Sequence, residues 1–376
     1  MTVLAAADLV VLSHLRWDWV WQRPQHLISR AAAQRRTWFV EEPRPCDVPS
    51  PVVRVVPAGP VTRVWLDTPQ DAGINEFSQS ATELYIVALT ELLGDRGRDV
   101  WLYAPTAIAV AEFLEPRLLI YDVMDDLASF ADAPPEMTLR MRRALTTADV
   151  AFTGGRSLHR GAVAVRGAQA THLFPSGVEC AHYARSRNLR RPHPRRVAGY
   201  VGVIDERLDL PLIAGLAAAL PDWDLHMVGP TTKIDPATLP QAENIVYQGM
   251  QRYEDLPRVM AAFDVALMPF ALNEATRSIS PTKTLEYLAA GLPVVSTRVP
   301  DVVADWSEVV HLADDATAFA AGCRIVVGDP PTARDSLVAP LRRRYEWDFI
   351  AAGMLALLEE TLAKRAGRPK AAEAGA

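Results

Sequence analysis

The sequence has little cysteine, no long uncharged apolar run and no excess of positive charge, and each of these absences excludes a class of protein. The only cysteines are Cys46, Cys180 and Cys323, too few and too scattered for a disulfide framework or a zinc motif. A membrane-spanning helix needs about eighteen uncharged apolar residues in a row, and no segment of the chain comes close to that length. A net charge of −6 argues against a general nucleic-acid binder. We therefore expect a protein of the reducing cytoplasm with no nucleic-acid partner.

Two further features bear on the location of the protein. The first residues lack a basic segment, and Asp8 interrupts their apolar run, so we expect no secretory signal peptide. One basic run stands out against the acidic balance, formed by Arg185, Arg187, Arg190, Arg191, Arg195 and Arg196. It has two interpretations: a solvated linker between domains, or a weak peripheral contact with anionic lipids on the inner face of the membrane.

Several enzyme signatures are also missing. No Gly-x-Gly-x-x-Gly follows the first strand of either half, which argues against a dinucleotide-binding dehydrogenase. No spacing typical of zinc, haem or Ser-His-Asp chemistry occurs.

The chain alternates short apolar runs with segments of helical spacing, and its length favours two domains. Strands are predicted at 8–13, 37–40, 100–103, 118–121, 150–153 and 171–174, and in the second half at 197–203, 224–228, 244–247, 264–269, 293–297 and 309–312. Helices are predicted at 22–33, 134–146, 156–165, 210–220, 254–262, 281–290, 316–326 and 347–364. Apolar strands separated by helices indicate parallel sheets covered on both faces. We therefore predict an α/β protein of two Rossmann-like, doubly wound domains that face a central cleft.

The Pro-x-Gly stretch at 175–178 and the Arg-rich run after it indicate a linker between these domains. We predict an N-terminal domain over 1–182, a C-terminal domain over 183–346, a last helix at about 347–364 that packs back on the first domain, and a disordered tail over 365–376. Because such sheets bind ligands at the carboxyl ends of their strands, the cleft between the domains is the expected site.

The most informative segment is 273–296. Ser280 is predicted as the N-cap of a helix, Pro281 as its first residue and Gly291 as its C-cap glycine. Free N–H groups and the helix dipole favour an anion at this N-terminus. Lys283 adds a positive charge there, and Glu286 lies on the same face, where its carboxylate can accept hydrogen bonds from a ribose diol. From the pattern alone, a weak exposed Lys283–Glu286 ion pair explains the segment equally well.

The segment resembles the donor-site signature of retaining glycosyltransferases of the GT-B fold, especially those of the family 4 type. The matching positions are Pro281, Lys283, Glu286, Tyr287, Ala289, Gly291, Pro293, Val294 and Val295. The resemblance implies transfer of a sugar from a nucleotide sugar, UDP- or GDP-linked, with Glu286 on the ribose. One position departs from the pattern: Ser278 stands where the family has a second glutamate, which contacts the transferred sugar.

Further segments resemble other parts of the same family. Segment 199–209 is similar to the first strand and loop of the donor domain, and 248–257 to the segment beside the donor base. The resemblance implies a catalytic role for Arg207 and Lys283, through charge stabilisation of the leaving diphosphate. The donor-binding residues that we predict are Gly202, Arg252, Tyr253, Ser280, Pro281, Thr282 and Glu286.

The acceptor is expected on the first domain. Segment 13–27 follows the first strand, contains three tryptophans and is similar to the opening of bacterial glycosyltransferases of polysaccharide assembly, including teichuronic-acid-type enzymes. A buried aromatic cluster is the alternative interpretation. The carboxylates of segment 121–127 follow another strand and suit acceptor hydroxyls; a Mg²⁺ or Mn²⁺ site and a helix cap are the alternatives. The acceptor-binding residues that we predict are His14, Trp17, Arg23, His26, Asp122, Asp125 and Asp126.

Since enzymes that the chain resembles generally act without a bound metal, we predict neither a metal nor a resident cofactor, with the nucleotide sugar as co-substrate. The predicted function is a retaining glycosyltransferase acting on a carbohydrate or small-molecule hydroxyl. Two other functions stay open: a nucleotide-sugar 2-epimerase, and a catalytically silent glycan- or nucleotide-binding subunit of a polysaccharide assembly system.

Overall fold

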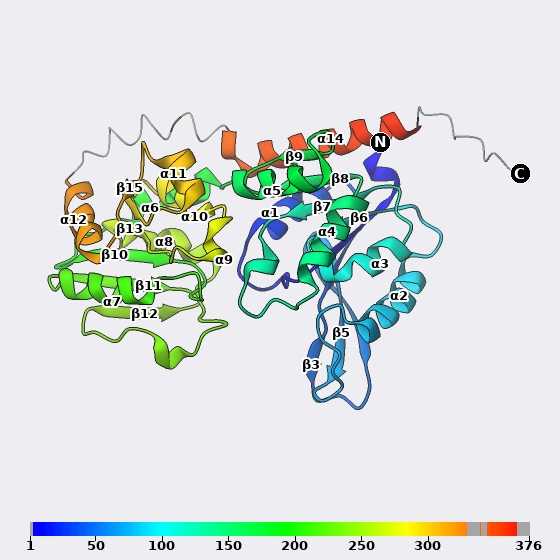
Figure 1. Cartoon of the computed structure of the whole chain (residues 1–376), viewed down its shortest axis with the longest axis horizontal. Helices are drawn as coiled ribbons and strands as arrows, with labels where there is room; N and C mark the ends of the chain where they lie inside the picture. The colour runs from blue at the N-terminus through cyan, green and yellow to red at the C-terminus, as the bar shows by residue number, and fades with distance from the viewer. Residues whose placement is uncertain (1–2, 329–338, 340–343, 367–376) are drawn as a thin grey trace, which may run out of the picture.

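The computed structural model describes residues 3–328, 339 and 344–366. Two sheets lie in separate bodies, with the N-terminal one on the right of Figure 1 and the C-terminal one on the left. Each strand and its neighbours are parallel, with the exception of one antiparallel pair, β4 and β5. The expected pair of α/β units with parallel sheets is therefore confirmed.

The first sheet has nine strands in the order β3-β5-β2-β1-β6-β7-β8-β9, with β4 paired to β5. The strands are β1 (Asp8–Ser13), β2 (Thr37–Glu41), β3 (Arg44–Cys46), β4 (Val52–Ala58), β5 (Val61–Pro69), β6 (Arg98–Leu102), β7 (Leu119–Val123), β8 (Val150–Thr153) and β9 (Thr171–Leu173). Successive side chains point to opposite faces, so Val10 and Leu12 enter one core while Leu9 and Val11 enter the other.

Helices cover both faces of this sheet. One core is closed by α2 (Gln79–Leu93), α3 (Ile108–Phe113), α4 (Met137–Thr147) and α5 (Arg156–Arg166), and the other by α1 (Arg23–Ala32) and α14 (Trp347–Ala366). Figure 1 shows α14 lying along the first body, far from the strands that precede it in sequence. Trp347, Ile350 and Met354 of α14 are buried against this sheet.

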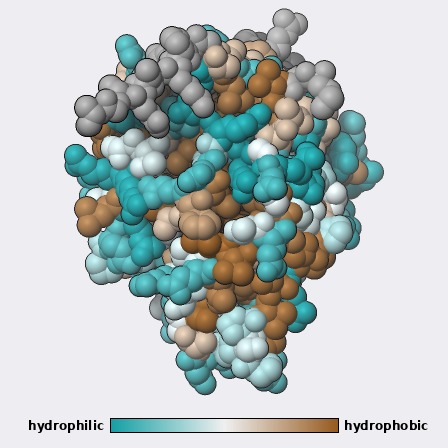
Figure 2. All heavy atoms as spheres, turned by 90° about the vertical axis from the view of Figure 1, so that its right-hand side faces the viewer, coloured by the Kyte–Doolittle hydropathy of each residue, from teal (hydrophilic) through white to brown (hydrophobic). Residues whose placement is uncertain are grey.

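The β4–β5 hairpin is not predicted by the sequence pattern. It projects from the first body (Figure 1), and β4 is exposed along most of its length. Apolar residues on the surface include Val53 and Val55 of β4, Val87 of α2 and Phe113 of α3. Figure 2, which views this end of the molecule, shows apolar surface gathered among polar residues. Such patches commonly contact other molecules, and this one faces away from the second body.

The second sheet has six strands in the order β12-β11-β10-β13-β14-β15. They are β10 (Arg196–Val201), β11 (Trp223–Val228), β12 (Ile245–Gly249), β13 (Val265–Met268), β14 (Val294–Ser296) and β15 (His311–Leu312). The direction of the strand order reverses between β10 and β13. Doubly wound sheets bind ligands beside such a switch point, at the carboxyl ends of the strands.

The second sheet is covered by α6 (Cys180–Leu189), α7 (Leu210–Ala219), α8 (Leu256–Ala261), α9 (Glu274–Arg277), α10 (Thr282–Ala289), α11 (Pro300–Trp306) and α12 (Ala316–Val326). Short 3-10 helices occur at η1 (Leu4–Ala6), η2 (Pro105–Ala107), η3 (Leu127–Ser129), η4 (Pro236–Thr238) and η5 (Tyr253–Asp255). One core joins the second sheet to helices of the second body.

The Arg-rich run is not a linker, which corrects the prediction. The first two arginines of the run, Arg185 and Arg187, lie in α6, and this helix packs against α8 and α10. The Arg190 guanidinium donates to the carbonyl oxygen of Gly291 (3.2 Å), and Arg195 and Arg196 pair with Asp224 (2.7 Å) and Asp264 (2.6 Å). These arginines therefore serve contacts within the C-terminal body.

The chain crosses between the two bodies twice, and the crossings lie side by side. The Val178 N–H donates to the carbonyl oxygen of Tyr345 (2.7 Å), and the Trp347 N–H donates to that of Val178 (3.4 Å). Arg365 is helical and pairs with Asp149, so the predicted tail does not begin at 365. Residues 367–376 of that predicted tail lie outside the described residues. Within the described ranges, no helix combines the length and apolar character that crossing a bilayer requires.

Candidate functional site

The N-terminus of α10 stands at the switch point of the second sheet. The helix begins at Thr282 with Pro281 as N-cap, one residue later than predicted, because the Thr282 N–H reaches back to the carbonyl oxygen of Ser280 (2.9 Å). At the other end, Gly291 has a φ of +75°, and Leu292 donates to the carbonyl oxygen of Tyr287 (3.0 Å). This is the C-terminal motif for which a glycine was predicted.

Lys283 and Glu286 form an ion pair at this site. The Lys283 Nζ lies 2.8 Å from Glu286 Oε2, with the two side chains 20% and 11% exposed. They are thus a partly buried pair rather than an exposed one. Leu285, Leu288 and Ala289 on the other faces are buried in the core, which fixes the orientation of α10.

A cavity of about 120 Å³ lies between the two bodies at the start of α10. The first body contributes Trp21, Arg23, His26 and Asp125, and the second contributes Gly202, Arg207, Ser280, Pro281, Thr282, Lys283 and Glu286. Gly202 is needed here because a side chain would collide with the Tyr200 ring. The predicted diphosphate-binding residues therefore share one cavity with residues of the first domain.

A larger cavity of about 460 Å³ lies on the other side of Lys283 and Glu286, which line both. Its walls are the tryptophan loop 17–21 of the first body and residues 250–254 of the second. Tyr253 is held in place: its ring stacks on His182 at 4.3 Å between centroids, and its hydroxyl donates to Glu179 Oε2 (2.7 Å). The side chain of Arg252 is 81% exposed and lies 3.4 Å from Glu254.

Arg207 faces the smaller cavity but already has a partner. Its Nη2 lies 2.7 Å from Asp205 Oδ2, and its Nε donates to the same carboxylate. Burial alone would lower the pKa of Arg207, but these hydrogen bonds and the charge of Asp205 raise it. Asp125 adds to the effect. Arg207 is thus a fixed positive charge at the cavity.

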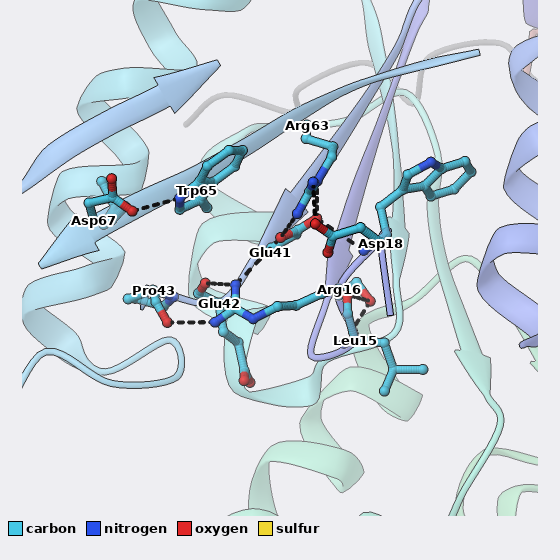
Figure 3. Close-up of polar contacts among 12 residues, drawn as sticks. Leu15, Arg16, Asp18, Glu41, Glu42, Pro43, Arg63, Trp65 and Asp67 are labelled. Carbon is cyan, nitrogen blue, oxygen red and sulfur yellow. Dashed lines mark hydrogen bonds and ion pairs between the residues drawn. The ribbon is translucent and has the colours of Figure 1, made fainter. Parts of the chain in front are cut away.

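A buried carboxylate anchors the tryptophan loop, as Figure 3 shows. Glu41, fully buried at the end of β2, accepts a hydrogen bond from the Trp17 backbone N–H (3.0 Å). Arg63 of β5 donates to Glu41 (2.6 and 2.9 Å) and to Asp18 (2.8 Å), while Arg16 donates to the carbonyl oxygens of Glu42 and Pro43. The sequence analysis did not include Glu41 or Arg63, and no local pattern indicates them, because the two paired residues are 22 positions apart.

The aromatic residues of this loop differ in position. Trp17 is 7% exposed and packs against Phe39 and Trp21, in line with the buried-cluster alternative, although it also borders the larger cavity. His26 stacks on Trp347 (4.9 Å between centroids) and accepts a hydrogen bond from Trp21 Nε1 (3.1 Å). Burial, followed by nearby positive charges, lowers the pKa of His26 well below its usual value, so the ring is neutral.

Asp122, predicted to bind an acceptor, faces Arg23 rather than either interdomain cavity, while Arg23 borders the smaller cavity. Arg23 and Asp122 are 2% and 0% exposed, and the Arg23 guanidinium donates to both Asp122 oxygens at 2.9 to 3.1 Å. A further Arg23 N–H donates to the carbonyl oxygen of Phe174 (2.9 Å). The Asp122 carboxylate is thus held in a buried ion pair that joins β7 to α1.

The remaining predicted acceptor residues are separated. Asp125 lines the smaller interdomain cavity, and burial raises its pKa. Asp126 lines a third cavity of about 440 Å³ between α4, α5 and α9, together with Ser278. His14 is not among the residues that line either interdomain cavity. In the part of the chain that the structure describes, no group of His, Cys, Asp or Glu is arranged to hold a metal ion.

Glu42, whose backbone carbonyl accepts a hydrogen bond from Arg16, makes the stability of the protein depend on pH in a testable way. Burial, then the charge of Glu76, raises the pKa of Glu42 from 4.5 to about 8. The folded state therefore holds this proton more tightly than the unfolded state, and stability is lost as the pH rises from 4.5 toward 8. Glu42→Gln should raise the melting temperature relative to the unsubstituted protein by about 2 to 5 °C more at pH 8 than at pH 5. Melting curves of both proteins across this range measure the difference, with the exposed Glu243→Gln as control. An equal effect of Glu42→Gln at both pH values would contradict a carboxyl that stays protonated in the folded state.

Two facing α/β domains with a helix N-terminus at the switch point of the second define the class of the fold. It is the GT-B fold. Sucrose-phosphate synthase from Thermosynechococcus elongatus superposes with a TM-score of 0.70 at 17% identity, over 95% of this chain and 100% of that one. The E. coli trehalose-6-phosphate protein bound with UDP-2-fluoro glucose has a TM-score of 0.71 at 12% identity (94% and 99% covered). Anabaena HepE in complex with UDP and glucose has a TM-score of 0.69 at 13% identity (94% and 100% covered).

Sequence comparison gives matches of two kinds. Residues 196–329 match the family model described as "Glycosyl transferases group 1". A Bacillus subtilis (strain 168) protein named as a teichuronic acid biosynthesis glycosyltransferase, TuaH, is 28% identical over 177 residues, which are 43% of this chain. The match spans 44% of that relative's length. The resemblance of segment 273–296 to glycosyltransferases of the GT-B fold is thereby confirmed.

Proposed function

We propose that this chain is a retaining glycosyltransferase that transfers a sugar from a nucleoside diphosphate donor, UDP- or GDP-linked, to an acceptor hydroxyl. The observation that carries the proposal is the position of Lys283 and Glu286, which line both cavities of the interdomain cleft. The family match of residues 196–329 supports it, as does the presence of UDP or a UDP-sugar in two structures of the same fold.

The two cavities suit the two parts of such a donor. The smaller one combines the N-terminus of α10 with Lys283 and Arg207, a set that suits a diphosphate. The larger one offers Met250 and Tyr253 to a base, and its volume of about 460 Å³ is that of a small-ligand site. Glu286, between them, is the acceptor for the ribose diol.

The chemistry is charge stabilisation rather than covalent catalysis. The bond between the anomeric carbon and the diphosphate oxygen breaks, and the acceptor oxygen bonds to the same face of that carbon. The acceptor proton passes to the departing diphosphate oxygen. Negative charge grows on the diphosphate as the bond breaks, so fixed positive groups lower the barrier. Lys283, Arg207 and the α10 N-terminus are those groups, while Asp125 and Trp21, across the smaller cavity, suit the acceptor.

Nucleoside diphosphates should raise the melting temperature of the protein. A ligand present at about 100 times its dissociation constant stabilises the native state by about 2.7 kcal/mol, which is several degrees. We expect UDP or GDP to give the largest shift, because the proposed site holds base, ribose and diphosphate together. A thermal-shift series with nucleosides, nucleoside monophosphates, diphosphates and inorganic diphosphate measures each contribution.

The series also separates the proposed function from its alternatives. No shift with any nucleoside diphosphate would contradict the donor site. A shift without release of nucleoside diphosphate from the corresponding sugar nucleotide would favour a silent binding subunit, which the serine at position 278 supports. Conversion of the sugar nucleotide into its epimer without acceptor would favour the 2-epimerase.

A further inference from the structure

Tyr183 is a cavity residue that the sequence analysis did not select. It lies on α6, its side chain is 1% exposed, and it lines the larger cavity together with Glu286 and Tyr253. Its hydroxyl makes no hydrogen bond of good geometry among the described residues, although it lies beside the carboxylate of Glu286 and the hydroxyl of Tyr253. The spacing of Cys180 and Tyr183, both buried and three residues apart, is the helical signal that could have identified it.

A buried hydroxyl whose contacts with Glu286 and Tyr253 are poorly aligned requires an explanation. Such a group is costly, and a phenylalanine would fill the same space without the cost. Burial first, and then the negative charge of Glu286, raises the pKa of the Tyr183 hydroxyl well above its usual value. The phenol thus keeps its proton and offers a donor beside a carboxylate.

The position of this hydroxyl along the cleft indicates which part of a ligand it meets. Of these two cavities, residues 280–282 at the helix N-terminus line only the smaller one, and residues 250–254 line only the larger one. Glu286 borders both cavities, and Tyr183 lies in the larger one beside it. In a nucleoside diphosphate the ribose stands between the diphosphate and the base, as these two residues stand between the two ends of the cleft.

The Lys283–Glu286 ion pair is compatible with Tyr183 as a second partner of Glu286. Glu286 Oε2 is held by the Lys283 Nζ at 2.8 Å. When Lys283 turns to a diphosphate, the carboxylate needs new donors, which a ribose diol and a phenol supply together.

We propose that the Tyr183 hydroxyl binds the ribose of the donor together with Glu286, so that the site selects ribonucleotides over 2′-deoxyribonucleotides. This inference rests on the proposed function, because it assigns a residue to the same donor site. A phenol beside a carboxylate donates to the carboxylate or to a ribose oxygen and accepts from the 2′-hydroxyl. Removal of the 2′-hydroxyl, or of the phenol oxygen, breaks the same set of hydrogen bonds.

Calorimetric titration of the full chain with UDP, GDP and their 2′-deoxy forms tests the inference. We expect the unsubstituted protein to bind the ribose form about tenfold more tightly. In Tyr183→Phe the ribose form should bind about fivefold to tenfold more weakly while the 2′-deoxy form binds as before, so that the preference disappears. Tyr247→Phe is the matched control, since its hydroxyl donates to the carbonyl oxygen of Pro240 away from the cavity.

The outcomes separate the inference from the function on which it rests. An unchanged preference in Tyr183→Phe, or an equal loss of affinity for both forms, would overturn the role of Tyr183 but leave the donor site in place. Failure of the unsubstituted protein to bind any nucleotide would overturn both. Should the phenylalanine variant lose its cooperative melting transition, Tyr183→Met, which keeps an apolar side chain there, provides the same comparison.

Discussion

Replacing Lys283 with alanine is expected to lower the turnover of the sugar nucleotide about 100-fold to 1,000-fold, the usual loss when one preorganised charge-stabilising group is removed. The ammonium group faces the smaller cavity, where negative charge grows on the leaving diphosphate. Stability should change little, because the Lys283–Glu286 pair is only partly buried and contributes about 1 kcal/mol, or about 2 to 4 °C. Release of nucleoside diphosphate, measured beside a melting curve, gives both quantities.

The chain offers a matched control for this substitution. Lys364 forms a similar local pair within α14, with its Nζ 2.6 Å from Glu360 Oε1, but it is 72% exposed and lies outside the cavities described above. Lys364→Ala should leave turnover unchanged. If Lys283→Ala lost stability in proportion to its activity, Lys283 would be a structural residue and the donor-site assignment would fail.

The sequence predicted most of the fold because buried parallel strands are short, nearly continuous apolar runs that can be recognised without the structure. β1 and β8 have the predicted bounds, and the other predicted strands differ by a few residues at their ends. The hairpin β4–β5 escaped prediction because β4 is exposed on both faces and carries Pro57, so it shows neither alternation nor an apolar run. Helix α6 escaped because its arginines, which contact neighbouring backbone and Gly291, look like a solvated segment.

The positions that backbone geometry determines could be predicted, whereas the pairing of charged side chains could be predicted less well. The glycine at 291 and the helix start near 281 follow from local geometry. Whether a charged side chain faces a ligand or another side chain depends on contacts far apart in sequence. Arg23 and Asp122, for example, are 99 residues apart and satisfy each other, which no local pattern reveals. Glu41 and Arg63 are hidden for the same reason.

Breaking the Arg23–Asp122 ion pair gives the largest stability change that we expect. Arg23→Ala leaves the Asp122 carboxylate fully buried without its donor, and breaking a buried ion pair in this way costs about 3 to 5 kcal/mol. For a chain of this size the melting transition should fall by about 6 to 15 °C. Asp122→Ala should do the same, because it leaves the Arg23 guanidinium, 2% exposed, without its carboxylate. Melting curves of the two variants measure both losses.

The double variant decides between a structural and a ligand-binding role. With Arg23→Met and Asp122→Leu together, no charge remains buried, and replacement of a buried pair by apolar side chains is often close to neutral. We therefore expect the double variant to melt at least about 5 °C above Arg23→Ala. Nucleoside diphosphate affinity should be retained in the double variant, because the α10 groups that form the proposed donor site are untouched. If the single variants kept their stability but lost transfer to the acceptor, the pair would belong to the acceptor site after all.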